Sequence, residues 1–536
     1  MADTGKITQI WRHAGGEGSY CYLDDMTTKE LAEQEAEHRS YDAIAAADAA
    51  NDQKRFERYT QQQQDERAQK FDLHLRIGVF FDGTGNNASN AADGQRCGAH
   101  HPINREDQDE SCKPYMSEPD SSYGNDPSNI SKLHELYEES KTLDGNGQHK
   151  NIKRRLYIEG IGTQAGKADS TFGLGTGRGE TGVEARVEDA FKKIRSLMNE
   201  LHQDHPNAEI RSLTLDTFGF SRGAAAARHF ANQVANRNNG PLIEVLRTTK
   251  ARLSPHFLAD SCDVSVRFIG LFDTVASIAA LSNLGNYSSS HVPRLQLYLN
   301  PQLFPCVVQL AARDEKRFNF ALSHVGPDHF EVTLPGAHSD LGGGYRALTE
   351  ETLMVTPMQS LEVAREQDVS ETSIYRDAEQ ARARWINDGW PADTLHIVTP
   401  QALPLPADTQ DRMGPARKKV YAGVQSRREV RGELSRVYLR VMHALAKAKN
   451  VPFGDIDPLE PDYAIPGELQ SLSDKLVTGN YSITPAEDAL LKQRYIHISG
   501  NWNHPHGRET GDGLTLRYIN SPMEDGIRVR HPHIPS

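Results

Sequence analysis

The sequence has no long hydrophobic run and no excess of positive charge. None of its apolar stretches approaches the ~18–20 residues that a bilayer-spanning helix requires, and its mean hydropathy is −0.63. Asp and Glu number 73 against 60 Lys and Arg, which gives a net charge of −13. Because nucleic acids and anionic lipid headgroups are held by clustered Lys and Arg, we expect no nucleic-acid partner and only apolar membrane contacts. We therefore expect a soluble protein without a transmembrane segment.

Cysteines are few, and a secretory signal peptide is missing. The chain has five cysteines, an odd and scattered set that is typical of folding in a reducing cytoplasm. Its first residues lack an apolar core followed by a small-residue cleavage site. Only Cys97 and Cys112 lie close together, and their spacing alone leaves open whether they pair after export.

Motifs for metals and nucleotides are also missing. HExxH, paired CxxC and EF-hand spacings do not occur, so we expect no catalytic metal or other cofactor, although Asp82 and Asp340 offer carboxylates to an adventitious ion. The segment from Phe80 to Thr84 is similar to a phosphatase loop, but Phe80 stands where that chemistry needs its attacking group. The glycines at 173–182 lack the phosphate-loop pattern and indicate a flexible loop instead.

The length predicts a catalytic domain with accessory regions, because single cores stop growing at about 250–300 residues. Residues 1–70 are polar and Ala-rich, with a capping-box spacing at Thr27, and predict a helical N-terminal arm. Residues 71–349 predict the core, with a surface insertion at about 88–129 rich in Asn, Asp, Ser and Gly. Residues 350–536 predict a mainly helical accessory region with candidate lid, membrane or partner contacts.

Within the core, short apolar runs alternate with helical patterns. Such alternation predicts an α/β fold with a mostly parallel sheet and helices on both faces. The predicted strands are Leu75 to Phe81, Arg155 to Ile158, Ile210 to Phe218, Val264 to Phe272 and Phe330 to Leu334.

The pentapeptide from Gly219 to Gly223 lies between a predicted strand and an Ala-rich helix. In that context G-x-S-x-G predicts a nucleophile elbow, in which a sharp turn projects Ser221 above the sheet. Side chains at Gly219 and Gly223 would collide with the neighbouring strand and helix, and glycine removes the collision. An ordinary strand–turn–helix with a serine cap is the alternative. The pattern favours a serine esterase of the α/β-hydrolase kind.

A serine nucleophile needs a base oriented by an acid, and in this fold they follow in the order Ser, Asp or Glu, His. Asp273 ends an apolar strand, where ligand-facing groups collect in an open sheet. His338 lies in a glycine-rich loop just past another strand, and His324 is its rival. The sequence thus predicts Ser221, Asp273 and His338 as a triad.

An esterase also needs N–H donors for the oxyanion. Arg222 follows the nucleophile and would supply the first backbone donor, and the turn at Gly83 and Thr84 the second. The alternative is a tight turn satisfied by Asp82 and Asn86, in which Asp82 accepts those amides and holds the loop closed.

Four motifs together resemble the first family of type VI secretion lipase effectors. They occur in the family's order and span roughly residues 72–346: Phe80 to Asn87, Gly219 to Ala224, Phe272 to Val275 and Pro335 to Tyr345. By motif position, the resemblance places the family's Ser, Asp and His on Ser221, Asp273 and His338.

The resemblance implies an antibacterial phospholipase with A1 or A2 positional activity. It also implies delivery without a signal peptide into the periplasm of a rival cell, docking to a VgrG spike protein and a cognate immunity protein. The segments at 276–330 and 346–400 are candidates for a lid over a long-chain substrate. Two alternatives stay open: a soluble carboxylesterase or thioesterase acting on short acyl chains, and a non-catalytic spike-associated module.

Overall fold

The structure is a computed structural model, and it describes residues 46–61, 70–101, 103, 109–140, 142–145, 147–170, 179, 181–237, 239–259, 263–276, 295–406, 415–503, 520–523 and 525–535. The chain divides into two units, residues 1–70 and residues 71–536. In the first unit, residues 46–61 are helical and almost entirely exposed. The capping box expected at Thr27 lies outside the described residues.

Seven strands of the second unit form an all-parallel sheet. Their order is β2-β1-β3-β5-β6-β8, with β4 beside β3. The bounds are β1 (Phe71–Phe81), β2 (His149–Ile158), β3 (Ala208–Phe220), β4 (Arg252–Leu253), β5 (Val264–Phe272), β6 (Val307–Ala312) and β8 (Phe330–Leu334). The register sets Phe220 opposite Phe272, and Phe272 opposite Leu310. The residues that follow β3 and β5 therefore meet at one edge of the sheet.

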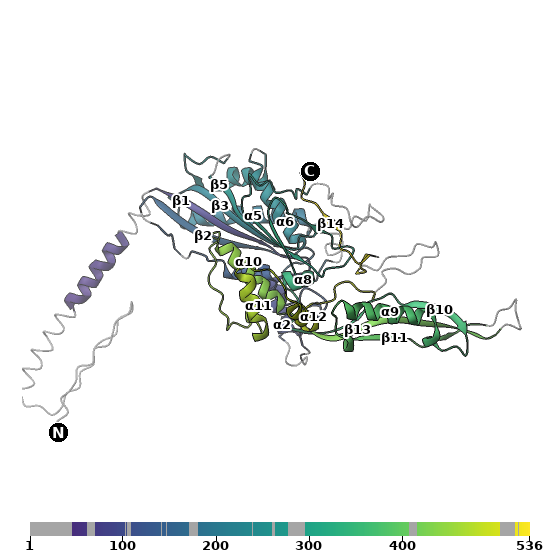
Figure 1. The fold of residues 1–536 in the computed structure, drawn as a ribbon. Coiled ribbons are helices and arrows are strands. Elements are labelled where there is room, and N and C mark those ends of the chain that lie inside the picture. The colour runs from purple at the N-terminus through teal and green to yellow at the C-terminus, as the bar shows by residue number, and fades with distance from the viewer. Residues whose placement is uncertain are drawn as a thin grey trace, which may run out of the picture. The chain divides into compact units, whose positions relative to one another are not determined.

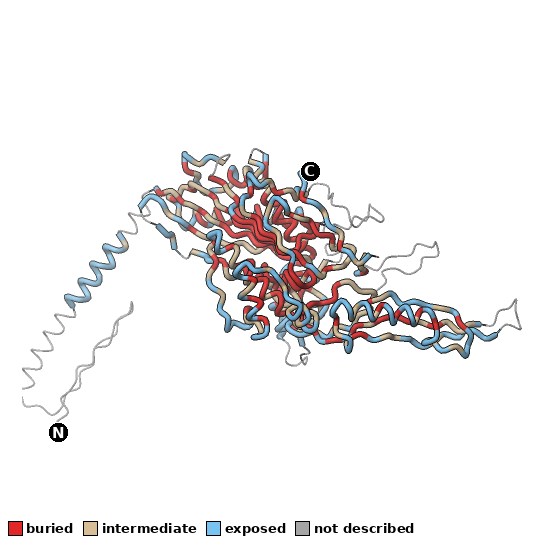
Figure 2. The backbone as a smooth tube through the Cα atoms, in the orientation of Figure 1, coloured by how far each residue is buried: buried red, intermediate tan, exposed pale blue. Residues whose placement is uncertain are grey.

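Helices cover both faces of this sheet. The inward residues of one face, such as Leu75 and Val79, pack with α5 (Val183–Asp204), α6 (Arg222–Ala235) and α7 (Pro241–Thr248). Phe80 and Phe218 point to the other face, which α3 (Asn129–Leu136) and α10 (Leu434–Lys447) cover. Figure 2 shows the buried residues concentrated along these strands. The predicted α/β class, with a mostly parallel sheet between helices, is confirmed.

A second sheet lies in the region that the sequence pattern assigns to helices. It is antiparallel, its long strand β13 (Arg417–Arg431) pairs with all of its neighbours, and α9 (Ser373–Asn387) lies along it (Figure 1). Those neighbours are β9 (Leu348–Met354), β10 (Gln359–Ala364), β11 (Leu395–Val398) and β12 (Leu403–Pro404). The expectation missed this sheet because β9 and β10 keep most of their residues partly or fully exposed, which removes the apolar alternation of a half-buried strand.

The expected helices do occur further along the chain, as α10, α11 (Gly467–Val477) and α12 (Pro485–Arg494). However, α10 packs directly against the parallel sheet. A side chain at Gly270 on β5 would touch the sulfur of Met442 on this helix. Within the described residues, no helix combines the length and apolarity needed to cross a bilayer. Of the two lid candidates, 276–330 includes residues 277–294, which lie outside the described residues, and otherwise holds β6 and β7 (Leu322–Ser323). The other candidate, 346–400, holds β9, β10, α9 and β11.

The last described residues, 520–523 and 525–535, return to the core as a C-terminal strap. Its strand β14 (Arg530–His531) pairs in parallel with β7 (Leu322–Ser323). At one end Phe318 donates its backbone N–H to Ser521, and at the other the ring of His533 accepts the N–H of Leu299. The strap is thus fixed along its length to β7 and to residues on both sides of it.

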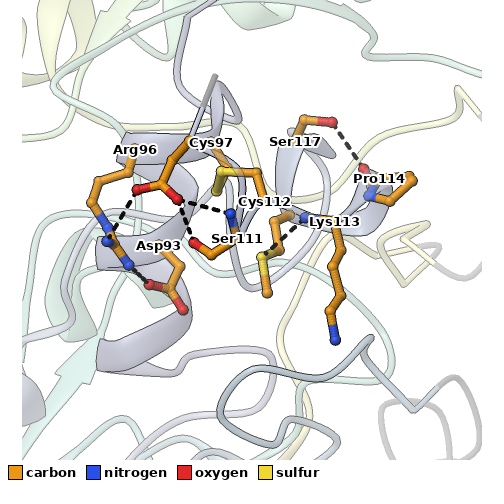
Figure 3. Close-up of a disulfide and its surroundings, with 10 residues drawn as sticks. Asp93, Arg96, Cys97, Ser111, Cys112, Lys113, Pro114 and Ser117 are labelled. Carbon is orange, nitrogen blue, oxygen red and sulfur yellow. Dashed lines mark hydrogen bonds and ion pairs between the residues drawn. A yellow bond between two sulfur atoms is a disulfide. The ribbon is translucent and has the colours of Figure 1, made fainter. Parts of the chain in front are cut away.

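The segment expected as a surface insertion contains a short helix and a disulfide. Helix α2 (Ala88–Cys97) begins at Asn87, whose side chain accepts the N–H groups of Ser89 and Asn90. Cys97 at its end is bonded to Cys112, with 5.6 Å between the two Cα atoms (Figure 3). The pairing that the sequence left open is therefore present, and Cys306 is free.

Loss of this disulfide should destabilise the protein. The bond closes a loop with a sequence separation of 15 residues, for which the loss of chain entropy in the unfolded state is worth about 3 kcal/mol. Urea unfolding of Cys112→Ser should show that decrease relative to the oxidised wild type. Wild type treated with a reductant should match the variant, and coincident midpoints for all three samples would contradict the stabilising role.

Candidate active site

Ser221 stands at a strained turn between β3 and α6. Its φ is 60° and its ψ −126°, a combination that a residue with a side chain rarely adopts. A side chain at Gly219 would reach within 2.4 Å of the carbonyl oxygen of Gly223, and one at Gly223 within 2.3 Å of the carbonyl oxygen of Asp82. The two flanking glycines therefore permit the close approach that a nucleophile elbow requires.

Asp273 follows β5 and bonds to the predicted histidine. Its φ is 46°, so it too has strained backbone. Its Oδ2 atom accepts a hydrogen bond from Nδ1 of His338 at 2.5 Å, and both side chains are buried. The rival His324 bonds instead to Glu331. The structure thus joins Asp273 to His338.

Backbone and ring contacts hold the Ser221 turn beside Asp273 and His338. The Ser221 N–H donates to the carbonyl of Phe272, and the Ser221 carbonyl accepts from the N–H of Val275, so the elbow is bonded on both sides of Asp273. The ring of Phe220 lies on the imidazole of His338, with 4.6 Å between centroids. Nε2 of His338 is buried and has no hydrogen-bond partner among the described residues. It is therefore available to a hydroxyl proton.

Arg528 of the C-terminal strap completes the surroundings of Asp273, and the sequence analysis missed it. Its Nη1 and Nη2 atoms lie 2.7 and 2.8 Å from the two carboxylate oxygens. The N–H of Ala312 donates to the same carboxylate at 2.9 Å. Burial raises the pKa of Asp273, but Arg528 and His338 lower it more, so the net pKa lies well below the ordinary value. Asp273 is therefore ionised.

A second carboxylate, Glu315, lies on the backbone side of His338. Its Oε2 atom accepts the His338 N–H, and Arg317 pairs with the same carboxylate at 2.7 Å. Burial raises the pKa of Glu315, but Arg317, Arg528 and His338 outweigh it and bring the pKa to about 2. For His338, burial lowers the pKa more than Asp273 raises it. The imidazole is thus kept neutral, as a base must be.

The proposed oxyanion donors are only partly free. The Gly83 N–H donates to its neighbour Asp82 at 2.7 Å, so this amide is occupied, as the alternative of a closed turn predicts. The Thr84 hydroxyl is buried and has no partner among the described residues. Arg222 is the first residue of α6, where backbone N–H groups have no partner within the helix. Thr84 and Arg222 remain the candidate donors.

The two carboxylates considered for an adventitious ion are engaged within the protein. Asp82 accepts the Tyr157 hydroxyl at 2.5 Å, and burial raises its pKa to about 6. Asp340, two residues after His338, accepts both the backbone N–H and Nδ1 of His497. No group of three metal-ligating side chains occurs in the described ranges. Asp340 thus fixes the loop of His338 to the C-terminal half of the chain.

Comparison with known proteins identifies the family. The model described as "T6SS, Phospholipase effector Tle1-like, catalytic domain" matches residues 245–364, which include Asp273 and His338. The solved structure of the Tle1 effector bound to the VgrG spike from the type 6 secretion system is 30% identical, with a TM-score of 0.66, and the match covers 86% of this chain and 94% of that one. The search of curated proteins gave no match.

Two further solved structures are less similar. An uncharacterized protein from Pseudomonas aeruginosa is 18% identical with a TM-score of 0.35, over 80% of this chain and 54% of that one. Esterase 2 of Thermogutta terrifontis is 10% identical with a TM-score of 0.19, over 60% and 85%. The identity and the coverage of the match to Tle1 show the family. The chain belongs to the Tle1-like phospholipase effectors of the type VI secretion system.

Proposed function

We propose that the chain hydrolyses acyl esters of glycerophospholipids, with A1 or A2 positional activity, by a Ser-His-Asp mechanism. One observation carries the proposal: the buried hydrogen bond between Asp273 and His338 lies at the sheet edge where Ser221 is held in a strained turn. Membership of a phospholipase family supports the substrate class.

In this mechanism Ser221 attacks the ester carbonyl while Nε2 of His338 takes its proton. Asp273 fixes the imidazole tautomer through Nδ1 and stabilises the imidazolium that forms. His338 then returns the proton to the leaving alcohol, and water hydrolyses the acyl-enzyme by the same route. The Arg222 N–H and the Thr84 N–H and hydroxyl would stabilise the oxyanion.

We further propose that the protein acts in the periplasm of a target bacterium and is delivered on a VgrG-type spike. The similar Tle1 structure is described as bound to such a spike. A cognate immunity protein would protect the producing cell. Residues 1–70 and the sheet around β13 are the candidate regions for these partners, because neither contains a residue of the proposed triad.

Replacement of the nucleophile should abolish hydrolysis. Ser221→Ala removes the attacking oxygen, and we expect a loss of at least about 10⁴-fold in kcat. Mass spectrometry of the products from a phospholipid with two different acyl chains measures this loss, and the wild-type products report which ester is cleaved. Wild-type cleavage of short-chain esters alone would favour the soluble esterase instead. Retained lipid hydrolysis by folded Ser221→Ala would refute the proposed nucleophile.

Removal of Arg528 should shift the acid limb of the pH profile upward. His338 must be neutral to act, so activity falls as the pH drops through its pKa. In Arg528→Gln the negative charge of Asp273 is no longer offset, so it stabilises the imidazolium and raises the pKa of His338. The acid limb of the pH profile of kcat/KM should therefore move up by about one pH unit. Glu315 and Arg317, which also face His338, stay in place.

Two variants separate charge from packing in this experiment. Arg528→Lys keeps the positive charge and should keep the acid limb near the wild-type position. Arg530→Gln removes an exposed charge from the same strap and should leave the limb unchanged. An unshifted limb in a folded Arg528→Gln would contradict the electrostatic role.

A further inference from the structure

Arg222, directly after the nucleophile, carries a guanidinium for which the described residues offer no partner. Among the described residues it makes no hydrogen bond and no ion pair, although its side chain is mostly enclosed by protein. Other arginines of low exposure, in contrast, each have at least one partner among the described residues. These are Glu159 for Arg186, Glu315 for Arg317, Glu351 for Arg428, Asp273 for Arg528 and three backbone carbonyls for Arg228.

The Arg222 charge is partly desolvated and has no acidic partner among the described residues. Burial lowers the pKa of Arg222 to about 10, and no acidic group offsets that effect. A desolvated charge is normally paired, and strongly perturbed groups collect at functional sites. Since part of the side chain stays open to solvent, its missing partner can come from outside the protein.

The position of Arg222 and the local charge both favour an anion beside Ser221. Arg222 adjoins Ser221 in the chain and is the first residue of α6, so its side chain starts directly beside the elbow. The free N–H groups of the same helix end add positive potential there. The two carboxylates that bond to His338, Asp273 and Glu315, are each neutralised by their own arginine. Arg222 is therefore an uncompensated positive charge.

We propose that the Arg222 side chain binds the phosphodiester group of the glycerophospholipid whose acyl ester is attacked by Ser221. This inference rests on the proposed function and names the group by which the site recognises its substrate class. The phosphate of such a lipid shares the glycerol unit with both esters, so a cation beside the nucleophile is placed to meet it. A guanidinium suits this task because its planar donors match two phosphate oxygens. Arg222 would then select phospholipids over neutral acylglycerols.

The test compares two substrates with identical acyl chains in the same mixed micelles. Phosphatidylglycerol carries the phosphodiester, and diacylglycerol lacks it. The preference of wild type for phosphatidylglycerol, as a ratio of kcat/KM values, should fall at least about tenfold in Arg222→Gln, mainly through KM. Arg222→Lys keeps the charge without the planar fork and should lose less. Arg195→Gln removes an exposed charge on α5 and should keep the wild-type ratio.

A second measurement needs no variant to fold. Inorganic phosphate should inhibit wild-type hydrolysis of diacylglycerol competitively, and it should inhibit Arg222→Gln less. Equal losses on both substrates in a folded Arg222→Gln, or no inhibition of wild type by phosphate, would overturn the role of Arg222 and leave the proposed function intact. Wild type that cleaves no phospholipid at all would instead overturn the proposed function and this inference with it.

Discussion

The buried carboxylate of Asp273 connects segments that lie far apart in the sequence. It accepts hydrogen bonds from His338, from Arg528 and from the N–H of Ala312, at the ends of different elements. A buried charge is tolerated only when it is paired and hydrogen-bonded, so these segments must be in place together. The strained turn at Ser221 is bonded to the residues on both sides of Asp273, and the elbow therefore depends on the same arrangement.

Charge placement within the site differs from the composition of the whole chain. The net charge is −13, which would discourage an anionic substrate if charge were spread evenly. At the triad, however, Arg528 and Arg317 neutralise the two carboxylates beside His338. Arg222, which follows the nucleophile, has no acidic partner among the described residues. Local pairing, and not the total charge, decides what such a site can accept.

The parts of the site that follow from local sequence were predictable. A strand, a glycine-flanked serine and an Ala-rich helix specify the elbow by themselves, and Asp273 and His338 follow strands. Arg528 was not predictable, because the short strap that carries it has no apolar periodicity. The burial of Arg528 depends on contacts near β7, about 200 residues away in the chain. The sheet around β13 was missed because two of its strands, β9 and β10, expose much of both faces. For Gly83 the sequence offered both a free and an occupied N–H, and the hydrogen bond to Asp82 decides for the occupied one.

Arg528 lies 255 residues after Asp273 in the chain. Synthesis runs from the N-terminus, so the ribosome completes the sheet strands, the elbow and both triad partners long before the neutralising arginine emerges. Until then a carboxylate destined for the interior has no countercharge and favours hydration. The surroundings of Asp273 can therefore be completed only after the C-terminal strap has been synthesised.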